Sequence, residues 1–298
     1  MGADCSGVTT AIANNVAVPN GVPMISPSAT SPALSTIADN GYFFRTAPSD
    51  ARQGQVLAEI TMERGINEVA VTYTNNDYGK GLADSFGGAY QALGGKISAV
   101  VPHEDGKADY SAEVASLDAS GADVLVVFGY VDQGGRYMIQ TSLDSGAFDK
   151  FILADGMFGE SLLQNVDGDL TGSFGTVPGT DSKGATTYAD MAKASGLKAG
   201  GPFTGESYDA AALLILAMQS AGSTDGAAIA SNVMGVANAP GEKIMPGELA
   251  KGLRILANGG AVDYVGASNV ELTGVGEASG SYKEFEIRNK AFQTVSFR

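Results

Sequence analysis

Residues 68–81 read EVAVTYTNNDYGKG, an apolar run rich in β-branched residues, followed at once by a polar turn and a helix start. Short apolar runs of the same kind recur at intervals of about 30 residues, as expected for successive βα units. They lie at Ile97–Val101, Val124–Phe128 and Phe151–Ala154. Both alternating faces of these runs are apolar, which is typical of parallel strands that helices cover on both sides. The sequence therefore predicts an α/β fold with a parallel-sheet core.

Helix signals fill the intervals between these runs, and 298 residues are enough for two domains. Ser49-Asp50 opens a helix that closes at Gly65, and Asp77 opens one that closes at Gly94-Gly95. Further helices are predicted to start near Tyr110, Asp132 and Thr204, and residues 180–258 are predicted to be mostly helical. At the N-terminal end, a helix from about Ser6 to Pro19 precedes a strand at Val22–Ser26. At the C-terminal end, Tyr282–Phe297 is predicted to form a hairpin with its turn at Arg288-Asn289-Lys290.

The charge of the chain argues against several classes of partner. Its 18 Lys and Arg face 33 Asp and Glu, which gives a formal net charge of −15. Nucleic acid and anionic membranes are therefore not expected as partners. The longest strongly apolar run, Ala210–Met218, is far shorter than the roughly 20 residues that a membrane-spanning helix needs.

The near absence of Cys and His removes whole classes of chemistry. A structural zinc site needs about four Cys or His ligands, but the chain has only Cys5 and His103, so no metal site is expected. His103 lies in the polar stretch PHEDGK and is expected to be a solvated loop residue. No GxxxxGK[ST] phosphate loop occurs, and no cofactor or catalytic residue is predicted.

Candidate ligand-binding residues follow the predicted strands, because open parallel sheets bind ligands beyond the carboxyl ends of their strands. These segments offer hydroxyls, helix-start amides, two tyrosines and one carboxylate, but no convergent His, Lys or Arg. Such a set suits a small zwitterion, whose carboxylate hydroxyls and amides can hold and whose ammonium needs a desolvated carboxylate. The segments that follow strands are Ser26-Pro27-Ser28-Ala29-Thr30, Thr74–Gly79 with Tyr78, Gly129-Tyr130 and Asp155-Gly156. A fifth candidate, Cys5-Ser6-Gly7, lies at the start of the first predicted helix.

Each of these residues also has an ordinary structural explanation. Ser6 and Asp77 are suited to capping helices, and Tyr78 and Tyr130 to packing in a core with one hydrated end. Asp155 is suited to shaping a turn. The residues by themselves leave both explanations open.

Several motifs resemble those of the branched-chain amino acid ABC transporter substrate-binding proteins, the Leu/Ile/Val-binding protein family. The first are CSG at 5–7 and GVPMISPSATSP at 21–32. FRT at 44–46 with Gln53-Gly54, DYGKG at 77–81, SYDAA at 207–211 and YVGA at 264–267 follow in the order of the family. The resemblance covers essentially the whole chain.

The resemblance implies the type I periplasmic binding protein fold, in which two Rossmann-like lobes with parallel-sheet cores are joined by three hinge crossovers and clamp the ligand in a cleft. The implied lobes are residues 1–47 with 178–275 and residues 48–177 with 276–298, with crossovers near 46–49, 176–180 and 273–278. The opening βαβαβ segment of the family is expected to be missing from the first lobe, and no signal peptide is expected in the first residues. A dimer through the incomplete lobe is a further expectation.

The resemblance also assigns roles by position. Ser6, Ser28 and Thr30, in a loop that includes Ala29, would hold the ligand carboxylate, and Asp155 would hold the ammonium. Tyr78 and Tyr130 would contact the ligand from the second lobe. The best-known members carry Glu where this chain has Asp155, so the identity of the ligand stays open.

The function implied is that of a periplasmic substrate-binding component of an ABC transporter, which binds a neutral amino acid, catalyses no reaction and delivers its ligand to a membrane permease. The alternative is a ligand-sensing receptor or regulatory domain of the same fold, specific for an amide or amino acid.

Overall fold

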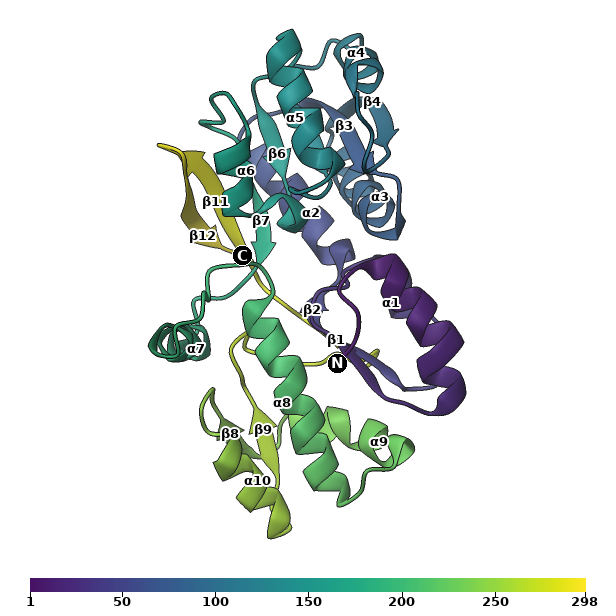
Figure 1. Ribbon diagram of the computed structural model, residues 1–298, viewed down its shortest axis with the longest axis vertical. Coiled ribbons are helices and arrows are strands. Elements are labelled where there is room, and N and C mark those ends of the chain that lie inside the picture. The colour runs from purple at the N-terminus through teal and green to yellow at the C-terminus, as the bar shows by residue number, and fades with distance from the viewer. The chain divides into compact units, whose positions relative to one another are not determined.

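The computed structural model describes all 298 residues and divides into two compact units. Unit 1 comprises Met1–Ser49 and Pro178–Ser281, and unit 2 comprises Asp50–Val177 and Tyr282–Arg298. The chain therefore passes from one unit to the other three times (Figure 1).

Unit 2 is built on a seven-stranded sheet with the strand order β12-β11-β7-β6-β5-β3-β4. The pairs β3–β4, β3–β5, β5–β6 and β6–β7 are parallel, and the hairpin β11–β12 is antiparallel. The backbone bonds of Gly172 with Ile287 and of Gly179 with Ser281 show that β11 also runs antiparallel to β7. The elements are α2 (Asp50–Glu63), β3 (Glu68–Thr74), α3 (Asp77–Ala92), β4 (Lys96–His103), α4 (Ser111–Asp118), β5 (Leu125–Phe128), α5 (Gly134–Ser145), β6 (Phe151–Leu153), η4 (Asp155–Met157), α6 (Glu160–Asn165), β7 (Phe174–Pro178), β11 (Tyr282–Arg288) and β12 (Ala291–Phe297).

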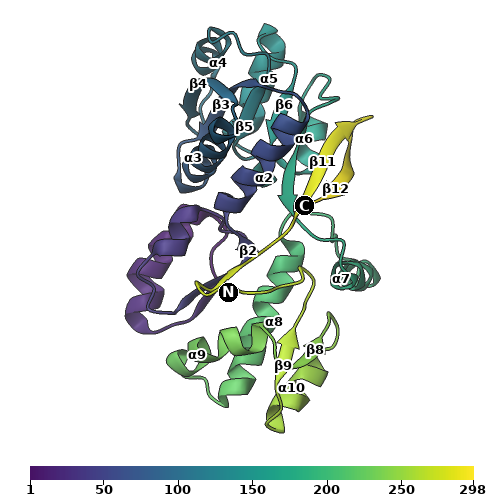
Figure 2. The ribbon, with the colours of Figure 1, turned by 180° about the vertical axis from the view of Figure 1, so that it is seen from behind.

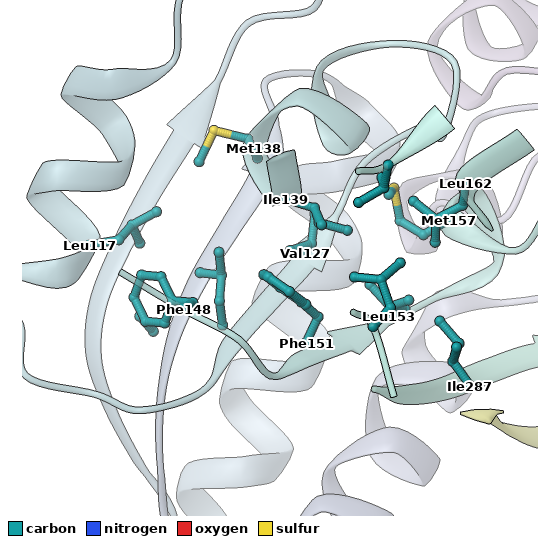
Figure 3. Close-up of a cluster of buried hydrophobic side chains, with 14 of the residues drawn as sticks. Leu117, Val127, Met138, Ile139, Phe148, Phe151, Leu153, Met157, Leu162 and Ile287 are labelled. Carbon is teal, nitrogen blue, oxygen red and sulfur yellow. The ribbon is translucent and has the colours of Figure 1, made fainter. Parts of the chain in front are cut away.

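Alternate residues of the unit 2 strands supply two separate cores, one on each face of the sheet. Leu125, Val127 and Phe151 pack with α4 and α5, whereas Val126 and Ile152 pack with α2 and α3. Figure 3 shows the first of these cores, with Val127, Phe151 and the α5 residue Ile139 side by side. Helix α5 lies in front of the sheet in Figure 1, and α2 lies in front of it in Figure 2. Unit 2 thus has three layers, as the apolar runs predicted.

Unit 1 contains a three-stranded parallel sheet in the order β1-β2-β10 and a separate parallel pair, β8–β9. Helices α8, α9 and α10 enclose its larger core with residues of these strands. The elements are α1 (Ser6–Ile12), the π-helical η1 (Ala13–Ala17), η2 (Val18–Asn20), β1 (Met24–Ser26), η3 (Pro32–Thr36), β2 (Phe43–Pro48), α7 (Lys183–Ala194), α8 (Thr204–Ala221), α9 (Gly226–Ala237), β8 (Glu242–Ile244), α10 (Leu249–Ala257), β9 (Val262–Tyr264) and β10 (Glu277–Ala278).

The predicted elements agree closely with these bounds, and the main difference concerns a unit boundary. The structure confirms the four predicted parallel strands and the C-terminal hairpin to within about two residues. It also confirms, to the same precision, the predicted starts of α2, α3, α4, α5 and α8. Asn289 and Lys290 form the hairpin turn and both have positive φ, as a two-residue turn of type I′ requires. The expected boundary after residue 275 lies too early, since β10 pairs with β2 and keeps residues up to Ser281 in unit 1.

Candidate functional site

Three neighbouring parallel strands of unit 2 bring three of the predicted residues together. Strands β3, β5 and β6 end at the same edge of the sheet, because parallel strands share their direction. Tyr78 lies in the first turn of α3 after β3, Tyr130 follows β5, and Asp155 follows β6 at the start of η4. Side chains from separate βα units therefore meet at one edge.

Tyr78 and Asp155 form the centre of this cluster. The Tyr78 hydroxyl donates to Asp155 Oδ1 at 3.1 Å and accepts from the Gly156 amide at 3.1 Å. The ring of Tyr130 stacks on that of Tyr78, with centroids 5.1 Å apart. A Cβ on residue 156 would lie 2.4 Å from the Gly129 carbonyl oxygen, so glycine is required for this close approach.

Asp155 is a buried carboxyl without a cationic partner in its surroundings. Only 4% of the residue is exposed, and burial raises the pKa of its carboxyl from 3.8 to about 6. Hydrogen bonds from Tyr78 and Gln53 partly offset this rise in pKa, but no positive group contributes. Because an isolated buried carboxylate is costly, the site is suited to a ligand that brings a positive charge.

Gln53 of α2 is a member of this cluster that the sequence analysis did not identify. Its side-chain amide nitrogen donates to the carbonyl oxygen of Thr176 at 3.2 Å. Its side-chain oxygen is buried and has no hydrogen-bond partner. Gln53 was visible only as part of a family motif, since a glutamine on an amphipathic helix gives no sign of burial.

The other predicted residues lie in unit 1, around the loop after β1. Ser6 begins α1, and its buried hydroxyl accepts from the Ser31 amide at 3.1 Å. Ala29 is fully buried, and its amide donates to Ser26 Oγ at 3.0 Å. Thr30 is 1% exposed and its hydroxyl has no hydrogen-bond partner. Ser6, Ala29 and Thr30 thus lie together in the buried loop after β1 and the helix start beside it.

Ser28 differs from its neighbours, because its hydroxyl donates to Asp4 Oδ1 at 2.8 Å. This bond to a carboxylate competes with the predicted role of Ser28 as a donor to a ligand. The ordinary explanation for two other residues is wrong, because the N-cap positions of α1 and α3 are Cys5 and Asn76 rather than Ser6 and Asp77.

His103 is not the solvated loop residue that its polar neighbours suggested. It ends β4, is 1% exposed, and its Nδ1 lies 2.8 Å from Thr72 Oγ1. Burial lowers the pKa of its imidazole from 6.5 to about 4. The prediction failed because β4 continues through the polar stretch, where His103 pairs with Thr74 of β3.

Two broader features concern metals and membranes. No group of three or more His, Cys, Asp or Glu side chains is placed so that it could hold a metal ion. None of the helices combines the length and the apolar composition needed to cross a lipid bilayer.

Two α/β units with three chain connections, a buried hydroxyl loop in one unit and a buried carboxyl at the strand ends of the other are typical of two-lobed ligand-binding proteins. A family model described as periplasmic binding protein matches residues 1–249, and the chain belongs to this family. The resemblance to branched-chain amino acid ABC transporter substrate-binding proteins is likewise confirmed by the relatives and structures that follow.

Two curated relatives are similar over most of the chain. The chemotactic signal transduction system substrate-binding protein BasB of Halobacterium salinarum is 26% identical over 99% of this chain and 70% of its own length. Leu/Ile/Val-binding protein homolog 1 of Brucella abortus is 31% identical over 74% of this chain and 59% of its own length. The chain thus spans between about three fifths and seven tenths of these relatives.

Two solved structures share the fold. The leucine-binding protein LivK of Thermotoga maritima superposes with a TM-score of 0.82 at 20% identity, over 99% of this chain and 78% of that one. A solute-binding protein of an R. palustris ABC transporter, in complex with benzoate, has a TM-score of 0.75 at 14% identity, over 99% of this chain and 77% of its own. The α/β fold with parallel-sheet cores predicted from the sequence is therefore that of the periplasmic binding proteins. These comparisons give no support to the expected dimer.

Proposed function

We propose that the chain is the periplasmic substrate-binding component of an ABC transporter and that it binds a neutral amino acid with an aliphatic side chain. Its role is binding and delivery to a membrane permease, without chemical conversion of the ligand. The R. palustris neighbour, a solute-binding protein of an ABC transporter, supports the transport role. The names of the Leu/Ile/Val-binding relatives support an aliphatic amino acid as the ligand, and the structure supports this ligand class through Asp155.

The buried Asp155 carboxyl carries this proposal. A ligand ammonium placed beside it would neutralise a charge that the protein leaves without a counter-ion. Charge-assisted hydrogen bonds to a carboxylate are roughly twice as strong as neutral ones. Benzoate has no ammonium, and its negative charge would be repelled by Asp155, so the benzoate complex of a structural neighbour is a poor guide to this site.

The opposite end of the zwitterion is assigned to unit 1. The buried Thr30 hydroxyl is a donor without a protein partner, and a ligand carboxylate would supply the acceptor. The stacked rings of Tyr78 and Tyr130 offer an apolar wall to the ligand.

A second function, ligand sensing in a signalling pathway, is favoured by one observation. The relative that matches 99% of this chain is named as a chemotactic signal transduction protein. Sensing and transport use the same binding step, so the ligand proposal applies to both. Co-purification of the protein with its membrane partner, a permease or a receptor, would distinguish them.

Calorimetric titration at about pH 7 with single compounds tests the proposal. Leucine, isoleucine, valine and alanine are the expected ligands, and benzoate, glutamate and glucose are the comparison set. We expect at least one of the four amino acids to bind at least about tenfold more tightly than every member of the comparison set, a difference of about 1.4 kcal/mol. Tighter binding of benzoate, glutamate or glucose would contradict the proposed ligand class.

A further inference from the structure

We propose that Arg45 is a positioning residue, which orients the loop assigned to the ligand carboxylate without touching the ligand itself. This inference rests on the proposed function of that loop. Arg45 lies in the middle of β2, the central strand of the three-stranded sheet, and its side chain is completely buried. A fully buried arginine is uncommon and needs partners for all its donors.

The guanidinium of Arg45 binds the loop through two backbone carbonyls. Its Nη1 donates to the carbonyl oxygens of Ala29 at 3.0 Å and Ser31 at 2.9 Å. These two residues flank Thr30, whose hydroxyl is buried without a partner. One nitrogen therefore fixes the backbone on both sides of the proposed ligand contact.

The bond from Arg45 to the Ala29 carbonyl also sets the direction of the Thr30 N–H, because the peptide group between these residues is planar. The Ala29 carbonyl and the Thr30 amide belong to one peptide group, in which a trans C=O and N–H point in opposite directions. By holding the Ala29 carbonyl on one side, Arg45 turns the Thr30 N–H to the other side, away from the cation. That amide is then directed as a donor that a carboxylate can use.

The rest of the guanidinium is anchored by residues of β10 and η3. Its Nη2 donates to Glu277 Oε2 at 2.6 Å and to Ser35 Oγ at 2.8 Å, and its Nε donates to the same carboxylate at 3.2 Å. The Ser35 hydroxyl also donates to Glu277 at 2.6 Å. A lysine could not reproduce this arrangement, because its ammonium is a single point of donation rather than a planar fork.

Substituting Arg45→Lys and titrating leucine and leucinamide separately tests the inference. Leucinamide keeps the ammonium and the side chain but has no carboxylate. We expect Arg45→Lys to weaken leucine binding at least about tenfold and leucinamide binding less than about threefold. A smaller ratio of leucine affinity to leucinamide affinity would show that Arg45 positions the carboxylate-binding loop, because a general loss of stability would weaken the binding of both ligands equally.

Two further variants calibrate this result. Arg64 also pairs with two glutamates, Glu284 at 2.7 Å and Glu286 at 3.0 Å, but belongs to unit 2. Arg64→Lys should leave the ratio of leucine affinity to leucinamide affinity unchanged.

Ser35→Ala removes one hydrogen-bond acceptor of Arg45 while disturbing the core little. It should lower this affinity ratio about threefold, and it remains informative even if Arg45→Lys does not fold.

Hydrogen exchange without ligand provides an independent measurement. Peptides that cover residues 26–34 should exchange faster in Arg45→Lys or Ser35→Ala than in wild type, and should be unaffected in Arg64→Lys. Unchanged exchange together with an unchanged leucine-to-leucinamide ratio would overturn the role of Arg45. Wild-type protein that binds no amino acid would instead refute the proposed function, and with it the assignment of this loop to a ligand.

Discussion

Asp155 shows how the setting of one residue decides its role. A turn-forming aspartate is ordinarily exposed, where its carboxylate is solvated. Here the side chain is buried, accepts a hydrogen bond from Tyr78 at 3.1 Å and has a pKa raised to about 6. The sequence could place Asp155 at a strand end but could not reveal this burial, which depends on α2 and α3 packing over the same edge of the sheet.

The raised pKa predicts that Asp155→Asn stabilises the ligand-free protein in a pH-dependent way. A carboxyl whose pKa is higher in the folded chain destabilises the fold wherever it is ionised. The penalty is therefore absent below about pH 4 and complete above about pH 6. A rise in pKa from 3.8 to about 6 corresponds to a penalty of about 3 kcal/mol. Urea unfolding at about pH 7 should show the variant to be more stable, and the difference should vanish near pH 4.

The asparagine introduced by Asp155→Asn has suitable partners, which makes this prediction sharp. Its side-chain oxygen can accept from Tyr78. Its amide nitrogen replaces the oxygen that accepts from Gln53, so the Gln53 amide must turn over and present its side-chain oxygen, which has no hydrogen-bond partner in the wild-type protein. Comparison of variant and wild type at each pH cancels the titration of His103, which is common to both. Equal stabilities at about pH 7 would mean that the carboxyl carries no burial penalty.

Secondary structure elements were the part of the fold that the sequence predicted best. Runs such as Val124–Phe128 are apolar on both faces, and this feature belongs to the strand itself. The two-residue β10 and the burial of His103 were not predictable in this way, since both depend on pairing with a distant strand. Arg45 was likewise visible only as part of the FRT motif, because its burial depends on the loop after β1 and on β10.

Asp209 connects two motifs that were noted in the sequence only for their resemblance to a family. It lies in α8, and its carboxylate accepts hydrogen bonds from the loop after β9. Tyr264 Oη and the Ala267 amide donate to Oδ1, each at 2.8 Å, and the Ser268 amide donates to Oδ2 at 2.7 Å. The SYDAA and YVGA motifs are thus two halves of one buried hydrogen-bond network.

This network predicts that Asp209→Asn destabilises the protein. An amide nitrogen at the Oδ2 position would face the Ser268 amide and hydroxyl. Burial raises the pKa of the Asp209 carboxyl, so removing its charge gives back part of the free energy, but we expect the two unpaired donors to cost more, about 2 to 3 kcal/mol in the free energy of unfolding. Asp225→Asn is the matched control, because Asp225 caps α9 and asparagine caps equally well. Urea unfolding that shows the two variants to be equally stable would contradict this account of Asp209.

At the scale of the whole molecule, the division of the chain gives the two units different chemistry. The loop after β1 in unit 1 offers buried hydroxyls and an oriented backbone, whereas the strand ends of unit 2 offer one buried carboxyl and two tyrosines. The family match establishes the class of protein. The proposed choice of an amino acid as the ligand rests on the complementarity of these two sets to its two charges.

The pairing of Asp155 with a ligand ammonium is the central claim, and one calorimetric experiment tests it most directly. Leucine and 4-methylpentanoate, which differ only in the ammonium group, are titrated into wild-type protein and Asp155→Asn at about pH 7. We predict that wild-type protein prefers leucine and that Asp155→Asn lowers this preference by at least about 2 kcal/mol, or roughly thirtyfold. The same preference in both proteins would contradict the claim, because Asp155 would then not be the residue that recognises the ammonium.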